Sequence, residues 1–231
     1  GATVAFDAAS LSPHDNLDAD YFDALFLSPH KLLGGVGSCG LLAIRKELVK
    51  SSKPTFAAGG TVSYVSRSSH FFAPSVERTE EGGTQHVMGL IRAALAYRLR
   101  NEVGLDVIKS REDELAKLFC EGLDKIPEIV SYFPRAVPRL PIFAFNVKGV
   151  SPYDFAEALS EDYGVQTRAG CACAGPYGHD LLGLKDDQKF DQKPGWVRVS
   201  LHYSHTPKDV AYLLKAIKKT IKKFKTKKDK K

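Results

Sequence analysis

Lys31 stands where a reactive amine is expected. It follows an apolar run, Ala24 to Leu27, that is typical of a short buried strand, and it precedes a glycine-rich loop. Open α/β sheets bind ligands at the carboxyl ends of their strands, and a glycine-rich loop there lets backbone N–H groups approach an anion. A lysine that is partly desolvated in such a place can form a Schiff base or act as a base.

A carboxylate occupies the equivalent place on the preceding strand. The apolar stretch Thr3 to Phe6 ends in Asp7, so two consecutive strand ends carry one carboxylate and one amine. Pyridoxal phosphate chemistry uses this pair: a lysine holds the aldehyde, and an acidic group keeps the pyridine nitrogen protonated. Taken alone, Asp7 as a turn cap and Lys31 as an ordinary loop lysine would be the simpler interpretation.

The surrounding pattern favours the cofactor. Ser-x-His-Lys from Ser28 to Lys31, followed by glycines and preceded by a strand ending in Asp, resembles the lysine region of class V aminotransferases and cysteine desulfurases. The resemblance runs from Val4 to about Leu214. It implies pyridoxal 5'-phosphate as cofactor, Lys31 as its Schiff-base lysine and Asp7 as the partner of the pyridine nitrogen.

Further cofactor contacts follow from the same resemblance. It implies that Ser28 and His30 help to hold the cofactor phosphate. Ser10 stands where the family usually has Gln or His near the phenolic oxygen, and a serine can donate a hydrogen bond there from shorter reach.

Two glycine-containing segments extend the match. Gly59-Gly60-Thr61-Val62 and Glu81-Gly82-Gly83-Thr84 look like family segments. In the family, the threonine of the second segment reaches the phosphate in the partner subunit of a dimer. Thr84 is therefore expected to bind the cofactor, although Gln85 replaces the usual proline. Thr84 as the N-cap of the following helix is the structural alternative.

The stretch from Gln166 to His179 carries the sulfur chemistry. Arg168-x-Gly170-x-x-Cys173 is similar to the desulfurase motif whose cysteine is the nucleophile, which assigns that role to Cys173. A thiolate beside an arginine on a glycine-flanked loop could attack the sulfur of a bound cysteine and leave a persulfide.

Two alternatives to this role stay open. Relatives with aminotransferase or lyase chemistry can carry an idle cysteine at the position of Cys173. Cys171, Cys173 and His179 could form part of a metal site, but two cysteines one residue apart do not have the usual ligand spacing.

Arginines are the candidates for substrate binding. The strand Trp196-Val197-Arg198-Val199-Ser200 resembles the family's Arg-x-Ser strand, whose arginine pairs with the substrate α-carboxylate. Arg168 and Arg198 are both expected to bind substrate. Without the resemblance, a salt bridge would be the simpler role for Arg198. The segment from Gly178 to Gly195 is longer than in the simplest desulfurases.

The composition is that of a globular protein. Of 231 residues, 43% are hydrophobic and 26% charged, and no apolar run is long enough to cross a membrane. The net charge of +6 comes from residues 215–231, which contribute +9 and leave −3 for the rest. Nucleic-acid binding is therefore not expected, nor is membrane contact by the lysine-rich tail. Four unevenly spaced cysteines suit a reducing compartment such as the cytoplasm, with mitochondria as the alternative.

The expected fold is α/β. Residues 1–104 would be the carboxyl-terminal part of the large domain of a fold-type-I pyridoxal-phosphate enzyme, and 105–224 a smaller α+β domain. Residues 225–231 are expected to be a disordered tail. Residues 56–84 resemble a loop, and the helix after them has one apolar face, Val87 to Leu95.

The sequence predicts a cysteine-desulfurase-like enzyme, acting as a homodimer on cysteine and passing sulfur to an acceptor protein. A class V aminotransferase or a lyase is the alternative. A non-catalytic fragment is a second alternative, because the resemblance implies an amino-terminal half that this sequence is expected to lack.

Overall fold

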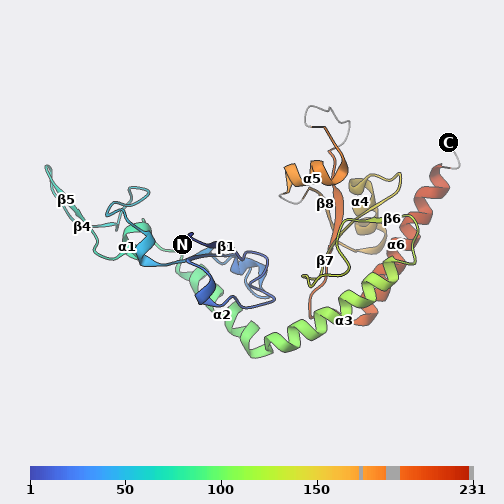
Figure 1. Cartoon of the computed structure of the whole chain (residues 1–231), viewed down its shortest axis with the longest axis horizontal. Helices are drawn as coiled ribbons and strands as arrows, with labels where there is room; N and C mark the ends of the chain where they lie inside the picture. The colour runs from blue at the N-terminus through green and yellow to red at the C-terminus, as the bar shows by residue number, and fades with distance from the viewer. Residues whose placement is uncertain (172–173, 186–192, 229–231) are drawn as a thin grey trace. The chain divides into compact units, whose positions relative to one another are not determined.

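The computed structural model describes residues 1–171, 174–185 and 193–228. The chain divides into two compact units, unit 1 (residues 1–107) and unit 2 (residues 108–231) (Figure 1). In chain order the strands are β1 (Ala5–Asp7), β2 (Ala24–Leu27), β3 (Leu41–Ile44), β4 (Val62–Val65), β5 (His70–Phe72), β6 (Ile129–Ser131), β7 (Ile142–Val147), β8 (Arg168–Gly170) and β9 (Trp196–Ser200). The α-helices are α1 (Val76–Glu80), α2 (Val87–Val103), α3 (Leu105–Leu123), α4 (Pro152–Tyr163), α5 (Gly175–Leu182) and α6 (Pro207–Lys228).

Unit 1 is built around a three-stranded sheet in the order β1-β2-β3. β1 runs parallel to β2, with Asp7 opposite Phe26, and β3 is antiparallel to β2. Asp23 fastens the start of the sheet, because its carboxylate accepts a hydrogen bond from the Val4 N–H at 2.9 Å and pairs with Arg45 at 3.1 Å. The parallel pair brings the carboxyl ends of β1 and β2 to one edge, as the sequence predicted.

The expectation of a loop over residues 56–84 was wrong. This segment contains the antiparallel hairpin β4–β5 and the short helix α1. Valine and aromatic side chains favour the strands, and Ser66 closes the turn by donating its N–H to the Ser69 carbonyl at 2.7 Å. Serine and glycine around these short strands hide the strand pattern in the sequence.

Helix α2 buries small residues and one arginine, whereas its large apolar side chains are exposed. Gly89, Ala93, Ala96 and Arg100 are the buried positions, one to a turn. The apolar face predicted from the spacing is present but exposed: Val87 is 55% and Leu95 56% accessible. The helix is therefore held in unit 1 by close contacts of small side chains.

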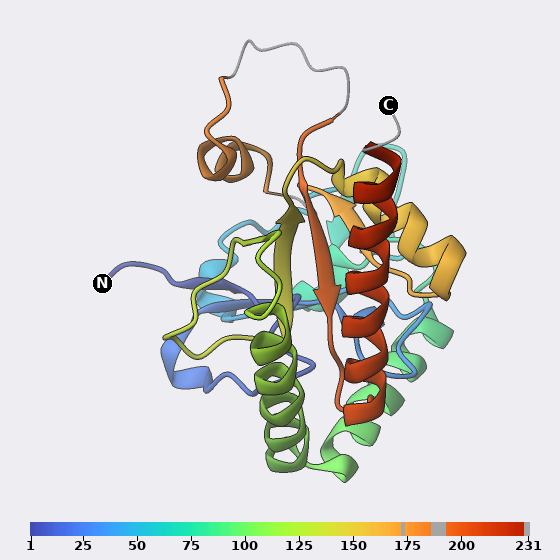
Figure 2. The ribbon, with the colours of Figure 1, turned by 90° about the vertical axis from the view of Figure 1, so that its right-hand side faces the viewer.

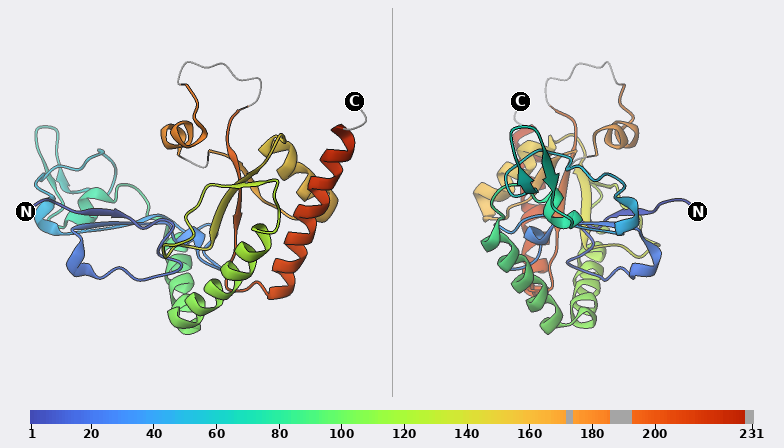
Figure 3. Two further views of the ribbon diagram at one scale, coloured as in Figure 1. Left: turned by 45° about the vertical axis from the view of Figure 1, so that its right-hand side comes forward. Right: turned by 90° about the vertical axis from the view of Figure 1, so that its left-hand side faces the viewer.

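Unit 2 has a four-stranded antiparallel sheet in the order β6-β7-β9-β8. β7 alternates in burial along its length, so Phe143, Phe145 and Val147 face inward. One core joins that face of the sheet to helices α3, α4 and α6. α4 lies beside α6 in both views (Figures 2 and 3). Phe143 belongs to this core, and the centre of its ring lies 4.8 Å from that of Phe119 and 5.3 Å from that of Phe133.

Local signals place the helix ends in unit 2. α4 has Pro152 in its first turn and ends at Gly164, which adopts the left-handed conformation at φ 65°. α6 begins with a capping box, in which the Thr206 N–H donates to Asp209 at 2.7 Å and the Asp209 N–H returns a bond to Thr206 at 3.3 Å. α6 then continues to Lys228, into the tail that was expected to be disordered from residue 225.

Two elements of unit 2 have no clear signal in the sequence. β8 is only three residues long, and α5 follows within a glycine-rich stretch. Within residues 1–171, 174–185 and 193–228, no helix is long and apolar enough to cross a membrane. The same residues contain no group of three or more His, Cys, Asp or Glu side chains arranged to hold a metal ion.

Candidate functional site

The Lys31 side chain meets the turn that follows β1. Lys31 is the last residue of a 3-10 helix, η2 (Pro29–Lys31), which begins directly after β2. Its Nζ donates a hydrogen bond to the Ser10 Oγ at 3.2 Å. Two residues that are 21 positions apart in the chain are thereby brought together. Both side chains are exposed, so a ligand can reach the amine.

Asp7 and Ser28 lie at the carboxyl ends of the parallel strands β1 and β2. Both line an open hollow of about 660 Å³, together with residues that include Phe26 and Leu42. One Asp7 carboxylate oxygen accepts the Ala9 N–H at 2.9 Å, so Asp7 also caps the turn that carries Ser10. Asp7 therefore caps the turn, as the simpler interpretation expected, and also lies at the ligand-accessible edge of the sheet.

The glycine loop after Lys31 packs tightly against η2. A Cβ added to Gly35 would lie 1.9 Å from the Pro29 carbonyl oxygen, so only glycine fits there. Helix α2 holds the next residues: Arg92 donates to the Val36 carbonyl at 3.2 Å, and the His86 Nε2 lies 3.2 Å from the Gly37 carbonyl oxygen. Sequence analysis missed Arg92 and His86, because contacts to backbone carbonyls leave no motif.

The remaining predicted phosphate ligands are exposed. His30 lies within η2, next to Lys31. Thr84 lies in the bend before α2, whose N-cap is His86, so the alternative role of Thr84 as a helix cap is wrong. Within unit 1, the structure thus brings Asp7, Ser10 and Ser28 to the strand ends beside Lys31. The role of Thr84 toward a partner subunit stays a prediction.

The two predicted substrate arginines form a second group, within unit 2. Arg168 on β8 and Arg198 on β9 are directly opposite each other in the antiparallel ladder, so both side chains emerge from the same face of the sheet. Val197 and Val199 on either side of Arg198 are buried in the opposite face. Arg168 is exposed and Arg198 is half-buried, and two guanidinium groups on one face of a sheet are suited to bind a carboxylate.

Cys173 lies outside the described residues, so its role stays a prediction. Cys171, two positions before it, is half-buried and its Sγ lies 3.2 Å from the Pro194 carbonyl oxygen. Gly170 adopts φ 115°, and a Cβ on Gly195 would lie 2.5 Å from the Gly170 Cα. These two facing glycines let β8 and β9 approach closely just before the cysteine segment.

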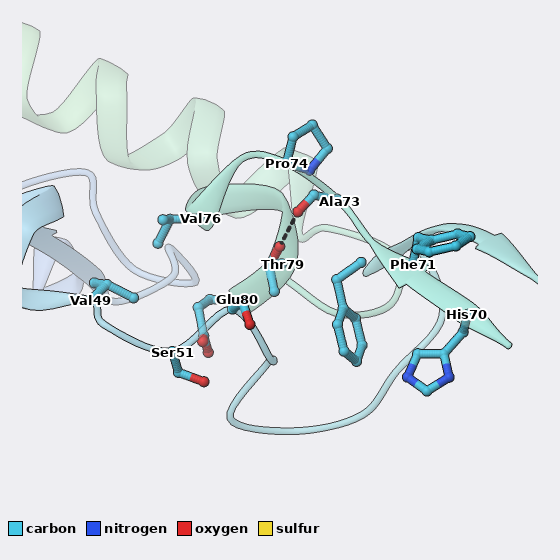
Figure 4. A pocket seen from close by; sticks show the side chains of 11 residues that line it. Val49, Ser51, His70, Phe71, Ala73, Pro74, Val76, Thr79 and Glu80 are labelled. Carbon is cyan, nitrogen blue, oxygen red and sulfur yellow. Dashed lines mark hydrogen bonds between the residues drawn. The ribbon is translucent and has the colours of Figure 1, made fainter.

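A second hollow of unit 1 contains none of the predicted site residues. It has a volume of about 390 Å³ and is bounded by β5 and α1 (Figure 4). Thr79 donates its hydroxyl to the Ala73 carbonyl at 2.8 Å, and the Glu80 carboxylate accepts the Thr55 N–H at 3.1 Å. The polar groups of Thr79 and Glu80 thus bind backbone atoms of neighbouring segments. We therefore attribute the hollow to the packing of the hairpin against α1.

The shifted ionisation equilibria lie at other places. Hydrogen bonds from the Thr206 side chain and backbone lower the pKa of Asp209. Burial, and then the charge of Glu112, raise the pKa of Tyr203. Hydrogen bonds from its own backbone and from Ser75, with the charge of Lys46, lower the pKa of Glu77. Asp209 and Glu77 stand in the first turns of helices, where carboxylates are stabilised.

The strand-edge residues fit pyridoxal phosphate. The lysine amine and the Ser10 hydroxyl lie within hydrogen-bonding distance, and a carboxylate and a second hydroxyl line the adjacent hollow. Lys31 is thus suited to hold the cofactor aldehyde, Asp7 the pyridine nitrogen, and Ser28 with His30 the phosphate.

Comparison with known proteins finds cysteine desulfurases that match nearly the whole of this chain. A "probable cysteine desulfurase" of Staphylococcus aureus (strain COL) is 31% identical over 222 residues, which are 95% of this chain and 51% of the relative. The apo structure of cysteine desulfurase from Thermococcus onnurineus NA1 matches with a TM-score of 0.82 and 31% identity, over 96% of this chain and 53% of that one.

A second solved structure, the cysteine desulfurase CsdA (S-sulfonic acid) from Escherichia coli, has a TM-score of 0.82 and 27% identity. The match includes 95% of this chain and 52% of that structure. The chain therefore spans about half the length of the relatives it matches, with the α/β fold of fold-type-I enzymes.

The model of the aminotransferase class-V family matches residues 1–213, which include both groups of predicted site residues. The enzymes of this family depend on pyridoxal phosphate. With that match and the strand-edge lysine and carboxylate, this chain belongs to the class V aminotransferase family.

Proposed function

We propose that this chain carries the cofactor lysine and the substrate arginines of a pyridoxal-phosphate-dependent cysteine desulfurase. The observation that carries the proposal is the 3.2 Å contact between Lys31 Nζ and Ser10 Oγ, beside the strand ends with Asp7 and Ser28. The cysteine desulfurases among the relatives support this activity over other reactions of the family. The substrate would be free cysteine.

In unit 1, each residue has one task toward the cofactor. The Lys31 amine holds the cofactor aldehyde and then moves the substrate α-proton, while the Ser10 hydroxyl orients that amine. The Asp7 carboxylate keeps a proton on the pyridine nitrogen. The bound cofactor supplies an electron sink for bonds broken at the substrate α-carbon.

The phosphate would be held by hydroxyl and imidazole groups from two copies of the chain. Ser28 and His30 supply these groups at the end of β2. Thr84 would reach the phosphate bound by a second copy, so the working assembly is a homodimer. The exposure of Thr84 and its position in a bend support this role.

In unit 2, Arg168 and Arg198 would bind the α-carboxylate of the substrate. Their opposed positions on β8 and β9 favour a fork of donors around one anion. Cys173 would accept the substrate sulfur, giving a persulfide and alanine, so no external oxidant or reductant is consumed. An acceptor protein would then receive the sulfur from Cys173.

Cofactor binding is the first test. The 231-residue chain mixed with pyridoxal phosphate should develop a visible absorbance band, and borohydride reduction should fix the cofactor on Lys31, as located by mass spectrometry. Lys31→Ala should remove the band. Lys50→Ala, at an exposed lysine outside the site, should keep it. A chain that stays colourless with added cofactor, or that is labelled at other lysines, contradicts the proposal.

The sulfur step has its own test, in the chain shown to bind the cofactor. Cys173→Ala should abolish persulfide formation from cysteine, and Cys171→Ala should leave it. If the Cys173→Ala variant yields as much sulfide as the parent, desulfuration through this cysteine is wrong. If it instead converts a keto acid to an amino acid, transamination, the alternative within the family, replaces it.

A further inference from the structure

A charged side chain is buried at the far end of α2. Arg100 is only 8% exposed, although a buried guanidinium is costly unless its donors are satisfied. Its Nη1 donates to the Ser12 carbonyl, and to the Asp15 carbonyl at 3.3 Å. Its Nη2 donates to the Asn16 Oδ1 at 2.7 Å. All three acceptors belong to the turn that follows β1.

Two other side chains of α2, those of Asn101 and Tyr97, contact the Arg100 guanidinium and orient it. The Asn101 Oδ1 accepts from the Arg100 Nε at 3.2 Å and from Nη2 at 3.0 Å. The guanidinium carbon also lies 5.2 Å from the centre of the Tyr97 ring. The planar fork is therefore aimed away from the helix and into the turn.

The turn held by Arg100 is the one that presents Ser10 to Lys31. At its start, the Ala8 N–H donates to the Phe26 carbonyl at 2.9 Å and so ties the turn to β2. The bonds inside the turn are local: the Ser12 N–H reaches the Ala8 carbonyl at 3.0 Å, and the Asp15 N–H reaches the Leu11 carbonyl at 3.0 Å. Arg100 connects the second half of the turn, at Ser12, Asp15 and Asn16, to helix α2.

The opposite side of the site is fastened to the same helix. Arg92 and His86, two and four turns before Arg100, contact the carbonyls of the glycine loop after Lys31. Helix α2 therefore holds the lysine loop near its start and the Ser10 turn near its end.

We propose that Arg100 is a positioning residue for the Lys31 amine. By binding the carbonyls of Ser12 and Asp15 and the Asn16 amide, it keeps the Ser10 hydroxyl against Lys31 Nζ. Its importance for pyridoxal phosphate binding rests on the function proposed above, but its effect on Lys31 is measurable in the chain without cofactor.

The first experiment compares Arg100→Gln with Arg98→Gln in the full chain without cofactor. Arg98 also lies on α2, but it is exposed and paired with Glu102, so its variant loses the same charge outside the turn. The measured quantity is the rate at which an amine reagent modifies Lys31, read by mass spectrometry. We expect about threefold to tenfold faster modification in Arg100→Gln, the factor that the loss of one hydrogen bond predicts.

Asn16→Ala keeps the test decisive if Arg100→Gln fails to fold. Asn16 is exposed, and its truncation removes one acceptor of Arg100 while keeping the buried cation. It should accelerate Lys31 modification in the same direction, and hydrogen exchange over residues 8–16 should rise in parallel. If Lys31 is modified at the Arg98→Gln rate in both folded variants, the positioning role is overturned.

The second experiment adds pyridoxal phosphate. Arg100→Gln and Asn16→Ala should shift the wavelength of the visible band and weaken cofactor binding, whereas Arg98→Gln should match the parent. If the parent itself shows no band, the proposed function fails, and the modification rates still decide the role of Arg100. If the variants bind with the parent's band and affinity, Arg100 does not position the site for its cofactor.

Discussion

The two units of this chain bury their side chains in opposite ways. In unit 2, phenylalanines, leucines and valines from three helices and the sheet close around one core. In unit 1, the buried apolar side chains other than Leu32 and Pro29 are alanines, and both Phe26 and Leu42 are about half exposed. Unit 1 therefore keeps its site in place chiefly through hydrogen bonds of loops and turns, whereas unit 2 is stabilised by burial of large side chains.

The largest expected effect follows directly from this difference. Phe143→Ala removes a ring that is fully buried between Phe119 and Phe133, and should lower the free energy of unfolding of unit 2 by about 3–5 kcal/mol. The matched substitution in unit 1, Phe26→Ala, affects a ring that is 48% exposed and should cost much less.

Denaturant titration followed by hydrogen exchange in each unit measures this, because the fluorescence of Trp196, the sole tryptophan, reports on unit 2 alone. The transition should move strongly in Phe143→Ala and stay in place in Phe26→Ala. Equal shifts would show that the units do not differ in the way their burial suggests.

A smaller effect sharpens the comparison from the side of unit 1. Leu42 and Leu95 are more than half exposed, so apolar dyes should bind around them. The double variant Leu42→Ser, Leu95→Ser should reduce the fluorescence of 8-anilinonaphthalene-1-sulfonate, while its free energy of unfolding changes by less than about 0.5 kcal/mol.

Val137→Ser is the control for dye binding, because Val137 is equally exposed but belongs to unit 2. The fluorescence of the dye with the Val137→Ser variant should equal that with the parent. A large loss of stability in the double variant would mean that these leucines support the fold of unit 1, contrary to their exposure.

The smallest expected effect concerns the start of α6. Hydrogen bonds from Thr206 hold the pKa of Asp209 below its ordinary value of 3.8. The stability that this carboxylate contributes is therefore present above that value and is lost as the pH falls through the folded-state pKa. The melting-temperature difference between the parent and Asp209→Ala should shrink as the pH falls below 3.8 and the carboxylate becomes protonated.

Asp113→Ala controls for the loss of one negative charge, since Asp113 lies exposed on α3. If the melting-temperature difference between the parent and Asp209→Ala did not depend on pH, the charge of Asp209 would not contribute to the stability of the capping box. Both variants can be followed by circular dichroism at matched ionic strength.

Sequence reasoning correctly placed the carboxyl ends of the two parallel strands. The strand ends at Asp7 and Ser28 followed from apolar runs that stop abruptly. The hairpin β4–β5 was missed because serines interrupt its strands. Arg100 was missed because its partners are carbonyls and an amide some 84 to 88 positions away.

The exposed face of α2 shows a different limit. Periodicity correctly predicted an apolar face, but it cannot tell which face of a helix its own unit buries. Here Gly89, Ala93 and Ala96 allow the close approach, and the large side chains remain outside.

The facing glycines Gly170 and Gly195 have a consequence for the segment that carries Cys173. Gly170 leaves β8 with φ 115°, a backbone angle that residues with side chains rarely adopt, and Gly195 leaves no room for a Cβ beside it. The main chain at Gly170 therefore determines the direction in which Cys171, the last described residue before Cys173, leaves the sheet.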